Sequence, residues 1–161
     1  MDIKLCEADV QDAAAVADIF IQAVRHIDDV LYTEAEKNAW IKGADSMDFW
    51  AERIMQTRPV LAMCGSQAVG FIEYRPEEAY IDCLYVHPHY QRQGIAAALL
   101  AYVQHLAQQQ KQAALHTDAS KAALSFFERH GFTVCHTNRI ERNNIILVNY
   151  RMKRPLWLNQ L

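Results

Sequence analysis

Residues 91–97 combine residue types that suit the binding of a phosphate group. They read Gln-Arg-Gln-Gly-Ile-Ala-Ala and lie between an apolar stretch ending at Val86 and a long stretch with an apolar stripe from Gly94 onward. The first N–H groups of a helix have no partner within the helix and lie at the positive end of its dipole. Gly94 has no Cβ to hold a pyrophosphate away from the backbone, and Arg92 adds a positive charge. The segment therefore predicts an anion-binding turn.

Two carboxylates on neighbouring apolar stretches are candidates for proton transfer. Glu73 lies at the end of the stretch 67–74, and Asp82 lies in the middle of 79–86. Aspartate is depleted in strands, so a position in mid-strand favours a functional reason for it. Strict alternation would place Asp82 on the same face as Leu84 and Val86, opposite Ile81, Cys83 and Tyr85. Either carboxylate could act as a general base, and the alternative for each is a solvated residue at a strand edge.

The elements that must position these residues follow from hydrophobic periodicity and turn signals. We expect a two-residue hairpin turn at Gly65-Ser66, a helix start at Thr33 through Glu36, and a left-handed helix cap at Gly131. Strands are expected at 3–6, 60–64, 67–74, 79–86, 113–117, 132–136 and 145–152. Helices are expected at 12–27, at 32–41, from 45 to Pro59, from Gly94 through Leu106, and at 120–130. This order indicates a mixed sheet with helices on both faces.

Composition narrows the class of protein. A chain of 161 residues predicts a single domain over 1–161, and the net charge of −3 argues against a nucleic-acid or membrane partner. No apolar run approaches the ~18 residues of a membrane span, and the charged start is unlike a signal peptide. The four cysteines are widely spaced, which favours reduced thiols in a cytoplasmic protein without a bound metal. The five glycines form neither a dinucleotide nor a P-loop motif.

Two motifs together resemble the GNAT N-acetyltransferase superfamily. Its acetyl-CoA motif, Gln/Arg-x-x-Gly-x-Gly/Ala, matches residues 91–96, and its second block, Ala-Ser followed by Phe-Tyr-Glu-Lys-x-Gly-Phe, is similar to residues 119–132. The strand sequence 80–86 and the Phe-Phe-Glu-Arg form of the second block resemble the YafP-like group of small bacterial acyltransferases. The resemblance covers the whole chain. It implies an α/β (α+β) fold with a mixed, mostly antiparallel sheet of six to seven strands.

The resemblance also implies where acetyl-CoA, as co-substrate, would bind. The strands at 80–86 and 113–117 would splay apart at their C-terminal ends, with the pyrophosphate on 91–97 and the pantetheine arm along the backbone of 84–86. No metal or other cofactor is expected. The expected acetyl-CoA-binding residues are Leu84, Tyr85, Val86, Gln91, Arg92, Gln93, Gly94, Ile95, Ala96, Ala97, Ser120 and Phe127.

The expected chemistry is transfer of an acetyl group to the primary amine of a small molecule or peptide, by direct attack in a ternary complex. An amine of pKa about 10.4 is only ~0.04% neutral at pH 7, so Asp82 or Glu73 is expected to take its proton. Many family members place a tyrosine acid in the second block, where this chain has Phe127. Tyr85 and Tyr80 are the candidate substitutes. The first helices would bind the amine, and the candidates there are His26, Tyr32 and Trp40.

Several alternatives remain open from the sequence. Phe127 favours a non-catalytic acyl-CoA-binding sensor or scaffold as the second function, and acetylation of an aminoacyl-RNA or ribosomal target is a third that the net charge disfavours. The protein could be a monomer or a homodimer. A late basic cluster is either a solvated strand surface or a contact for an acidic substrate. That cluster comprises Arg139, Arg142, Arg151, Lys153 and Arg154.

Overall fold

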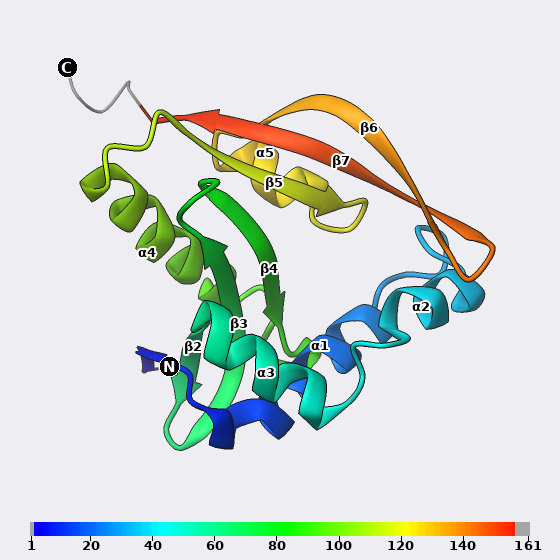
Figure 1. Ribbon diagram of the computed structural model, residues 1–161, viewed down its shortest axis with the longest axis horizontal. Helices are drawn as coiled ribbons and strands as arrows, with labels where there is room; N and C mark the ends of the chain where they lie inside the picture. Colours follow the sequence, from blue (N-terminus) through cyan, green and yellow to red (C-terminus); the bar gives the residue numbers. More distant parts are fainter. Residues whose placement is uncertain (1, 157–161) are drawn as a thin grey trace.

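A computed structural model of the protein describes residues 2–156 and contains one seven-stranded sheet (Figure 1). The strands are β1 (Ile3–Glu7), β2 (Val60–Cys64), β3 (Gln67–Arg75), β4 (Tyr80–Val86), β5 (Ala114–Ser120), β6 (Thr133–Arg142) and β7 (Ile145–Pro155). The helices are α1 (Ala13–Arg25), α2 (Glu34–Ile41), α3 (Met47–Thr57), α4 (Ile95–Gln109) and α5 (Leu124–Arg129), with short 3-10 turns η1 (Val10–Asp12) and η2 (Pro88–Tyr90). Met1 and 157–161, the ends of the predicted single domain, lie outside the described residues.

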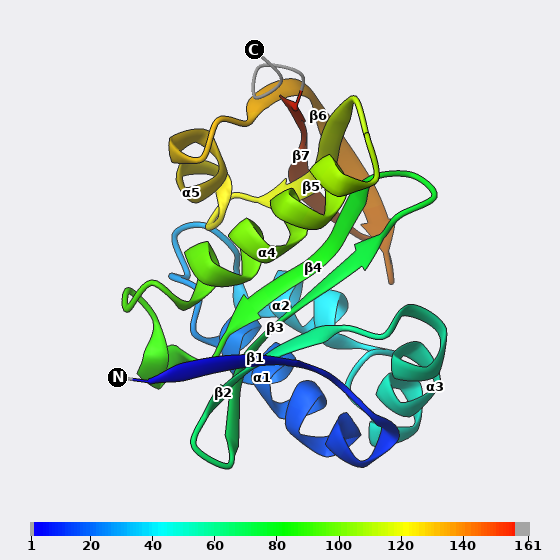
Figure 2. The same ribbon diagram turned by 90° about the vertical axis from the view of Figure 1, so that its left-hand side faces the viewer.

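The sheet confirms the predicted mixed, mostly antiparallel α/β fold. Its strand order is β1-β2-β3-β4-β5-β7-β6, and only β4 and β5 pair in parallel. One core lies between the sheet and α4 and includes Leu99, Val103 and Ile81, whereas a second core lies under α1 and α3 and includes Phe20 and Trp50. Figure 2 shows α4 crossing one face of the sheet with α1 on the other side. Within residues 2–156 no helix has the length and apolar character needed to cross a membrane.

Local turn and capping signals act as the sequence predicts. Thr33 and Glu36 form a reciprocal capping box at the start of α2, in which each side chain accepts a hydrogen bond from the other residue's backbone N–H. Gly65 has a φ of +61° in the two-residue turn that joins β2 to β3. Gly131 has a φ of +89° just beyond α5. These short-range signals therefore identify the ends of their elements.

The last third of the chain departs from the predicted bounds. Strand β5 continues to Ser120, because β7 pairs with it as far as Asn149, so α5 begins only at Leu124 instead of Ser120. Strand β6 extends to Arg142, well beyond the predicted end at 136, and joins β7 through a two-residue turn in which Asn143 and Asn144 have φ of 52° and 64°. Asparagine tolerates this left-handed conformation, so the Asn-Asn pair is a hairpin signal.

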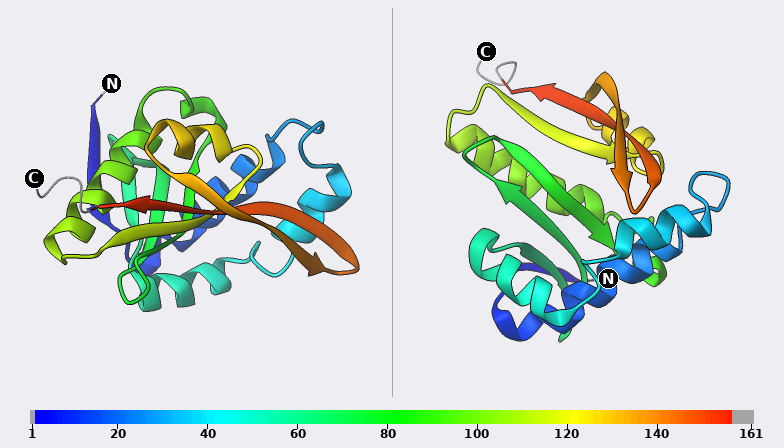
Figure 3. Two further views of the ribbon diagram at one scale, coloured as in Figure 1. Left: turned by 90° about the horizontal axis from the view of Figure 1, so that it is seen from above. Right: turned by 45° about the vertical axis from the view of Figure 1, so that its right-hand side comes forward.

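Strands β4 and β5 separate soon after they meet, as the family resemblance implies. Their parallel pairing covers only Tyr80 with His116 and Ile81 with Thr117. The Thr117 hydroxyl then donates to the carbonyl of Ile81 at 2.9 Å, at the point where the strands part. Beyond it the sheet opens between its two halves, as the right-hand view of Figure 3 shows. Among residues 2–156, this side of β4 has no strand partner beyond Ile81, so another extended chain can pair with it there.

A β-bulge at Asp82 corrects the predicted strand alternation. Glu73 pairs with Cys83 and Tyr74 pairs with Ile81, which leaves Asp82 as an extra residue in β4. Ile81 consequently packs in the same core as Leu84, and not on the face of Cys83. The bulge turns Asp82 and Cys83 toward the same side of the sheet, the side covered by α3.

Candidate active site

The first cleft lies between the end of β4, the start of α4 and the helix α5, and its volume is about 970 Å³. Gln93 does not line it: this exposed residue directs its side-chain Nε2 toward the His89 carbonyl at 3.5 Å. The structure brings the other predicted acetyl-CoA residues together around this cleft. They are Leu84, Tyr85, Val86, Gln91, Arg92, Gly94, Ile95, Ala96, Ala97, Ser120 and Phe127.

The turn before α4 has the geometry of an anion-binding site. Gly94 is the N-cap of α4 with a φ of +83°, and no atom lies within 4 Å of the Cβ that another residue would add. The first intrahelical bond of this turn runs from the Ala98 N–H to the Gly94 carbonyl at 3.0 Å. The N–H groups of 95–97 therefore have no partner within the helix. Arg92, also at positive φ, lines the same cleft.

Gln91 links this turn to the end of β4. Its side-chain Nε2 donates to the Val86 carbonyl at 3.0 Å. The bond fixes the start of the turn relative to the strand edge that the pantetheine arm is expected to follow. It also means that the Val86 carbonyl already accepts one hydrogen bond from the protein.

A second cavity, of about 520 Å³, lies on the α3 side of the splayed strands. Aromatic rings form much of its wall, and they pack edge to face. The ring centroids of Phe20 and Tyr85 are 5.2 Å apart, and those of Phe49 and Trp50 are also 5.2 Å apart. A cavity of this size and lining suits one small molecule or one side chain with an apolar body.

The two cavities share part of their walls. Tyr85 and Trp40 face both, and their ring centroids are 6.5 Å apart. Phe127, which is buried with 3% exposure, also lies at this junction. The two cavities are therefore adjacent and meet at these side chains. The complete set of shared residues is Trp40, Leu84, Tyr85, Ser120, Ala123 and Phe127.

Glu73 is fully buried and both of its oxygens are bonded. Arg53 contacts both oxygens in a two-pronged ion pair, with 3.0 Å between Arg53 Nε and Oε2. The Thr57 hydroxyl donates to Oε2 at 2.7 Å. Glu73 does not line either of the two cavities. Glu73 therefore holds Arg53 in place, and neither of its oxygens is available to bind an incoming amine.

Asp82 has a different environment. Its Oδ2 accepts from Arg53 Nη2 at 3.1 Å and from Arg75 Nε at 2.9 Å, while its Oδ1 has no hydrogen-bond partner among residues 2–156. The side chain lines the second cavity and is 27% exposed. The two guanidinium groups fix the carboxylate by one oxygen, so the other can accept a proton or a hydrogen bond.

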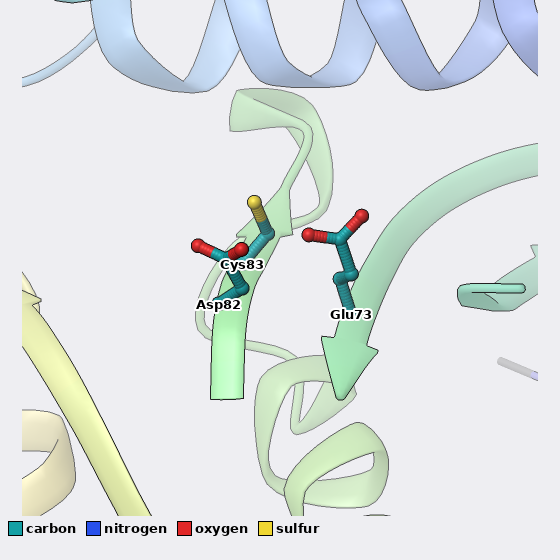
Figure 4. A group of neighbouring side chains, drawn as sticks. All are labelled: Glu73, Asp82 and Cys83. Carbon is teal, nitrogen blue, oxygen red and sulfur yellow. The ribbon is translucent and has the colours of Figure 1, made fainter. Parts of the chain in front are cut away.

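Glu73, Asp82 and Cys83 bring their ligand atoms within 4.8 Å of one another (Figure 4). This spacing would suit a metal ion. The Arg53 guanidinium already bonds both carboxylates and approaches Cys83 Sγ at 4.0 Å, so it supplies the positive charge here. Burial raises the pKa of the Cys83 thiol well above its usual range, with nearby Glu73 and Asp82 raising it further. In these surroundings the Cys83 thiol thus keeps its proton.

The tyrosines near the junction differ in their freedom to donate a proton. The Tyr80 hydroxyl donates to Asp118 Oδ2 at 2.7 Å, and burial followed by that bond raises its pKa far above the usual range. Tyr85 faces both cavities, and burial raises the pKa of its phenol well above the usual range. Tyr80 is therefore engaged elsewhere, and Tyr85 is a protonated phenol at the junction.

The predicted amine-binding residues fall in different places. Trp40 lines both cavities, whereas His26 lines only the first cleft, away from the second cavity. Tyr32 is buried, and its ring faces the second cavity. Its hydroxyl donates to the Val148 carbonyl at 2.6 Å and accepts from the Lys121 N–H at 2.9 Å. Tyr32 thus offers a ring surface and holds the loop before α2 against β7.

The structure adds residues that the sequence analysis did not select. Arg53 lies on α3 one turn after Phe49 and Trp50, with its guanidinium 5.6 Å from the centre of each ring. In the sequence, the one feature that points to Arg53 is its position three and four residues after two aromatic residues, a spacing that places these side chains on one face of a helix. Asp118 also lines the second cavity, and its oxygens accept bonds from Tyr80, Asn138 and Arg151. Those partners come from three other strands, and no sequence spacing connects them.

Comparisons with known proteins agree with this geometry. Residues 28–154 match the model of the acetyltransferase (GNAT) domain family. The chain is 34% identical over 135 residues to the uncharacterized N-acetyltransferase YafP of Escherichia coli strain K12, and the match covers 84% of each protein.

Solved structures show the same fold. A GCN5-related N-acetyltransferase from Rhodopseudomonas palustris superposes with a TM-score of 0.90 at 29% identity, covering 97% of both chains. The PaiA N-acetyltransferase from Thermoplasma acidophilum, solved with coenzyme A, gives a TM-score of 0.81 at 17% identity over 96% of this chain and 99% of its own. With its splayed sheet, its glycine-capped turn and these relatives, the chain belongs to the GNAT family of N-acetyltransferases.

Proposed function

We propose that the protein transfers an acetyl group from acetyl-CoA to the primary amine of a small molecule or peptide, by direct attack in a ternary complex. The observation that carries the proposal is the pair of cavities that meet at Tyr85 and Trp40, one with an anion-binding turn and the other with an open carboxylate oxygen. The PaiA neighbour was solved with coenzyme A, which supports the same ligand here. The four free cysteines support a reducing, cytoplasmic setting.

Acetyl-CoA would bind in the first cleft. The N–H groups of 95–97 and the Arg92 side chain would hold its pyrophosphate, because unpaired N–H groups at a helix start attract anions. The pantetheine arm would lie along the free side of β4 at 84–86 as an added strand. Because Val86 already accepts a bond from Gln91, the Gln91 side chain would share or release that carbonyl when the arm binds. The thioester would then reach the junction beside Tyr85.

The amine would lose its proton to Asp82. At pH 7, deprotonating the ammonium form of an amine of pKa about 10.4 costs ~4.6 kcal/mol of free energy, at 1.36 kcal/mol per pK unit. Asp82 Oδ1 is the open oxygen of the second cavity, and it could take the proton directly or through one water. Arg53 and Arg75 hold the other oxygen and fix the orientation of the carboxylate. Glu73 supports this arrangement by anchoring Arg53.

Tyr85 would assist departure of the thiolate. The neutral amine nitrogen attacks the thioester carbonyl, the C–S bond breaks, and the sulfur leaves as a thiolate of conjugate pKa about 8.5. The nitrogen loses its second proton as it becomes an amide, and the thiolate takes up a proton in return, so the products are the amide and the free CoA thiol. A phenol with a raised pKa keeps its proton and donates a hydrogen bond to that sulfur. Phe127 supplies no proton, so the site depends on Tyr85 and on the modest basicity of the thiolate.

The test is acceptor-dependent release of the CoA thiol across a panel of amines, with the product identified by its mass. The proposal requires that one amine gains one acetyl group for each thiol released. Protein treated with a chelator should keep full turnover, because Arg53 provides the charge at the only cluster with metal-ligand spacing in residues 2–156. Tight acetyl-CoA binding without transfer to any amine would favour the alternative of a non-catalytic acyl-CoA sensor, for which Phe127 is the specific observation.

A further inference from the structure

The charges around the second cavity do not balance. The charged side chains that line the cavity, together with their ion-pair partners, comprise five cations and three carboxylates. The carboxylates are Glu73, Asp82 and Asp118, and the cations are Lys42, Arg53, Arg75, Arg142 and Arg151. The surplus of two positive charges belongs to Lys42 and Arg142, because each of the other cations has a carboxylate partner. Neither has a carboxylate within the 4.0 Å of an ion pair among residues 2–156.

Lys42 and Arg142 come from distant parts of the chain and meet at the same cavity. Lys42 is the C-cap of α2, and Arg142 is the last residue of β6, beside the turn to β7. Both side chains are exposed and both line the cavity. Figure 3 shows the β6–β7 hairpin extending from the body of the sheet to α2, and the bond from Tyr32 to Val148 ties the two together. This hairpin therefore brings a second exposed cation to the cavity that Lys42 lines, and the part of the cavity where these two exposed side chains lie is here called its mouth.

The carboxylates of the cavity have little capacity for further positive charge. Asp118 already accepts four hydrogen bonds, from Tyr80, Asn138 and two nitrogens of Arg151. Asp82 keeps one open oxygen, which the proposed mechanism assigns to the reacting amine. An acceptor with a second ammonium group would find no free carboxylate and would be repelled by the two cations at the mouth. An anionic group on the acceptor would instead be attracted to them.

We infer that the acceptor carries a carboxylate in addition to its amine, and that Lys42 and Arg142 bind this carboxylate while the aromatic wall holds the apolar part between the two charges. This inference rests on the proposed transferase function and narrows its acceptor class. The inference also bears on the basic cluster near the end of the sequence, which could be a solvated surface or a contact for an acidic substrate. Arg142 of this cluster lines the cavity, whereas Arg139 on the same strand does not. The acidic-substrate alternative thus applies to Arg142.

The test compares two acceptors that differ in one charge, para-(aminomethyl)benzoate and its amide. Both have a similar shape and the same aminomethyl group, so the ratio of their kcat/KM values isolates the carboxylate. The expected ratio is about tenfold or more in favour of the carboxylate, the size of one charge-assisted hydrogen bond. Equal or better transfer to the amide would overturn the inference and leave the transferase function standing. Failure of both amines, and of the wider panel, would overturn the two together.

Substitutions at Lys42 and Arg142 test whether these two residues bind the carboxylate. Replacing both cations with glutamate, Lys42→Glu with Arg142→Glu, should bring the ratio to one or below, because the mouth then repels the carboxylate. Single changes to alanine should each lower the ratio part of the way. Arg139→Glu is the matched control, since it makes the same charge change on β6 outside the cavity, and it should keep the ratio of the unmodified protein. A ratio unchanged in the double variant would show that the carboxylate binds elsewhere. Because the readout is a ratio within one preparation, a partly unfolded sample does not change it.

Discussion

Glu73 and Asp82 lie on adjacent strands and both contact Arg53, yet their surroundings give them different tasks. Glu73 is fully buried with both oxygens bonded, whereas Asp82 keeps Oδ1 open toward the second cavity. From the sequence both carboxylates are candidates for the base, and the mid-strand position of Asp82 favours it over Glu73. The structure favours Asp82, because a base must reach the proton that it removes.

Replacing Asp82 with asparagine removes the proposed base and keeps the shape of the side chain. We expect Asp82→Asn to lower turnover by about 10²-fold or more near neutral pH, the usual size of a general-base contribution. Affinity for acetyl-CoA should persist, because Asp82 does not line the first cleft. The deficit should shrink as pH rises toward the amine pKa of about 10.4, where the amine loses its proton unaided. A pH profile of kcat/KM measures both effects.

Glu73→Gln is the companion variant, and its main effect should be on stability. Removing one partner of a buried ion pair costs about 3–5 kcal/mol, so we expect thermal unfolding roughly 6–20 °C lower than in the unmodified protein. Asp82 is partly exposed, so Asp82→Asn should have a smaller effect. Wild-type stability in Glu73→Gln together with a large loss of turnover, alongside normal rates in Asp82→Asn, would transfer the role of base to Glu73.

The raised pKa of the Cys83 thiol can be tested by alkylation. Only the thiolate reacts with iodoacetamide, and burial keeps the Cys83 pKa above its usual range, so little thiolate forms near pH 8. Cys6 and Cys135 are exposed and serve as internal references. We expect Cys83 to be alkylated much more slowly than either, with the rate rising at higher pH, as measured by peptide mass spectrometry. Equal rates at pH 8 would contradict the raised pKa of this thiol.

At the scale of elements, local signals carry most of the predictable information. The capping box at Thr33, the hairpin at Gly65 and the helix start at Gly94 each depend on residues close in sequence, and the structure confirms them. The bulge at Asp82 depends on pairing between β3 and β4, so alternation along β4 alone places Ile81 on the wrong face. The pairing of β5 with β7 likewise shortens α5. Pairing between different strands therefore determines the face of Ile81 and the start of α5, and periodicity along a single segment does not reveal that pairing.

Gly94, in the turn before α4, can be tested by substitution. We expect Gly94→Trp to abolish acetyl-CoA binding in calorimetry, because a bulky side chain would enter the cleft at the point where the pyrophosphate meets the backbone. Gly94 has a φ of +83°, which asparagine tolerates better than other residues, so Gly94→Asn is the control for backbone strain. Helix content by circular dichroism should stay nearly unchanged in both. Unchanged affinity in Gly94→Trp would place the site elsewhere.

Arg92 tests the charge of the same turn. Arg92→Ala should weaken acetyl-CoA binding and reduce its dependence on salt, because it removes a full charge and leaves the backbone N–H groups in place. Calorimetry at low and physiological ionic strength measures the difference. A salt dependence equal to that of the unmodified protein would mean that Arg92 does not contact the ligand.

At the scale of the whole molecule, the two halves of the sheet are held together near the splay by few contacts. Strands β4 and β5 pair at only two positions, with the Thr117 hydroxyl bonded beside them. A ligand that lies between them adds bonds to both halves and should stabilise the native state. At a concentration 100 times its Kd, acetyl-CoA should add about 2.7 kcal/mol and raise the melting temperature by roughly 5–10 °C. Thermal unfolding with and without acetyl-CoA measures this, and an unchanged melting temperature would contradict binding in the cleft.

In the proposed reaction both substrates occupy their cavities together and react at the junction beside Tyr85. The most direct test is the initial rate of thiol release as the concentrations of acetyl-CoA and of an accepted amine are varied independently. Direct attack in a ternary complex predicts double-reciprocal lines that intersect. Parallel lines would indicate an acetylated enzyme intermediate, and thiol release that does not depend on the amine would show that no transfer to it occurs; either result would contradict direct transfer to the amine.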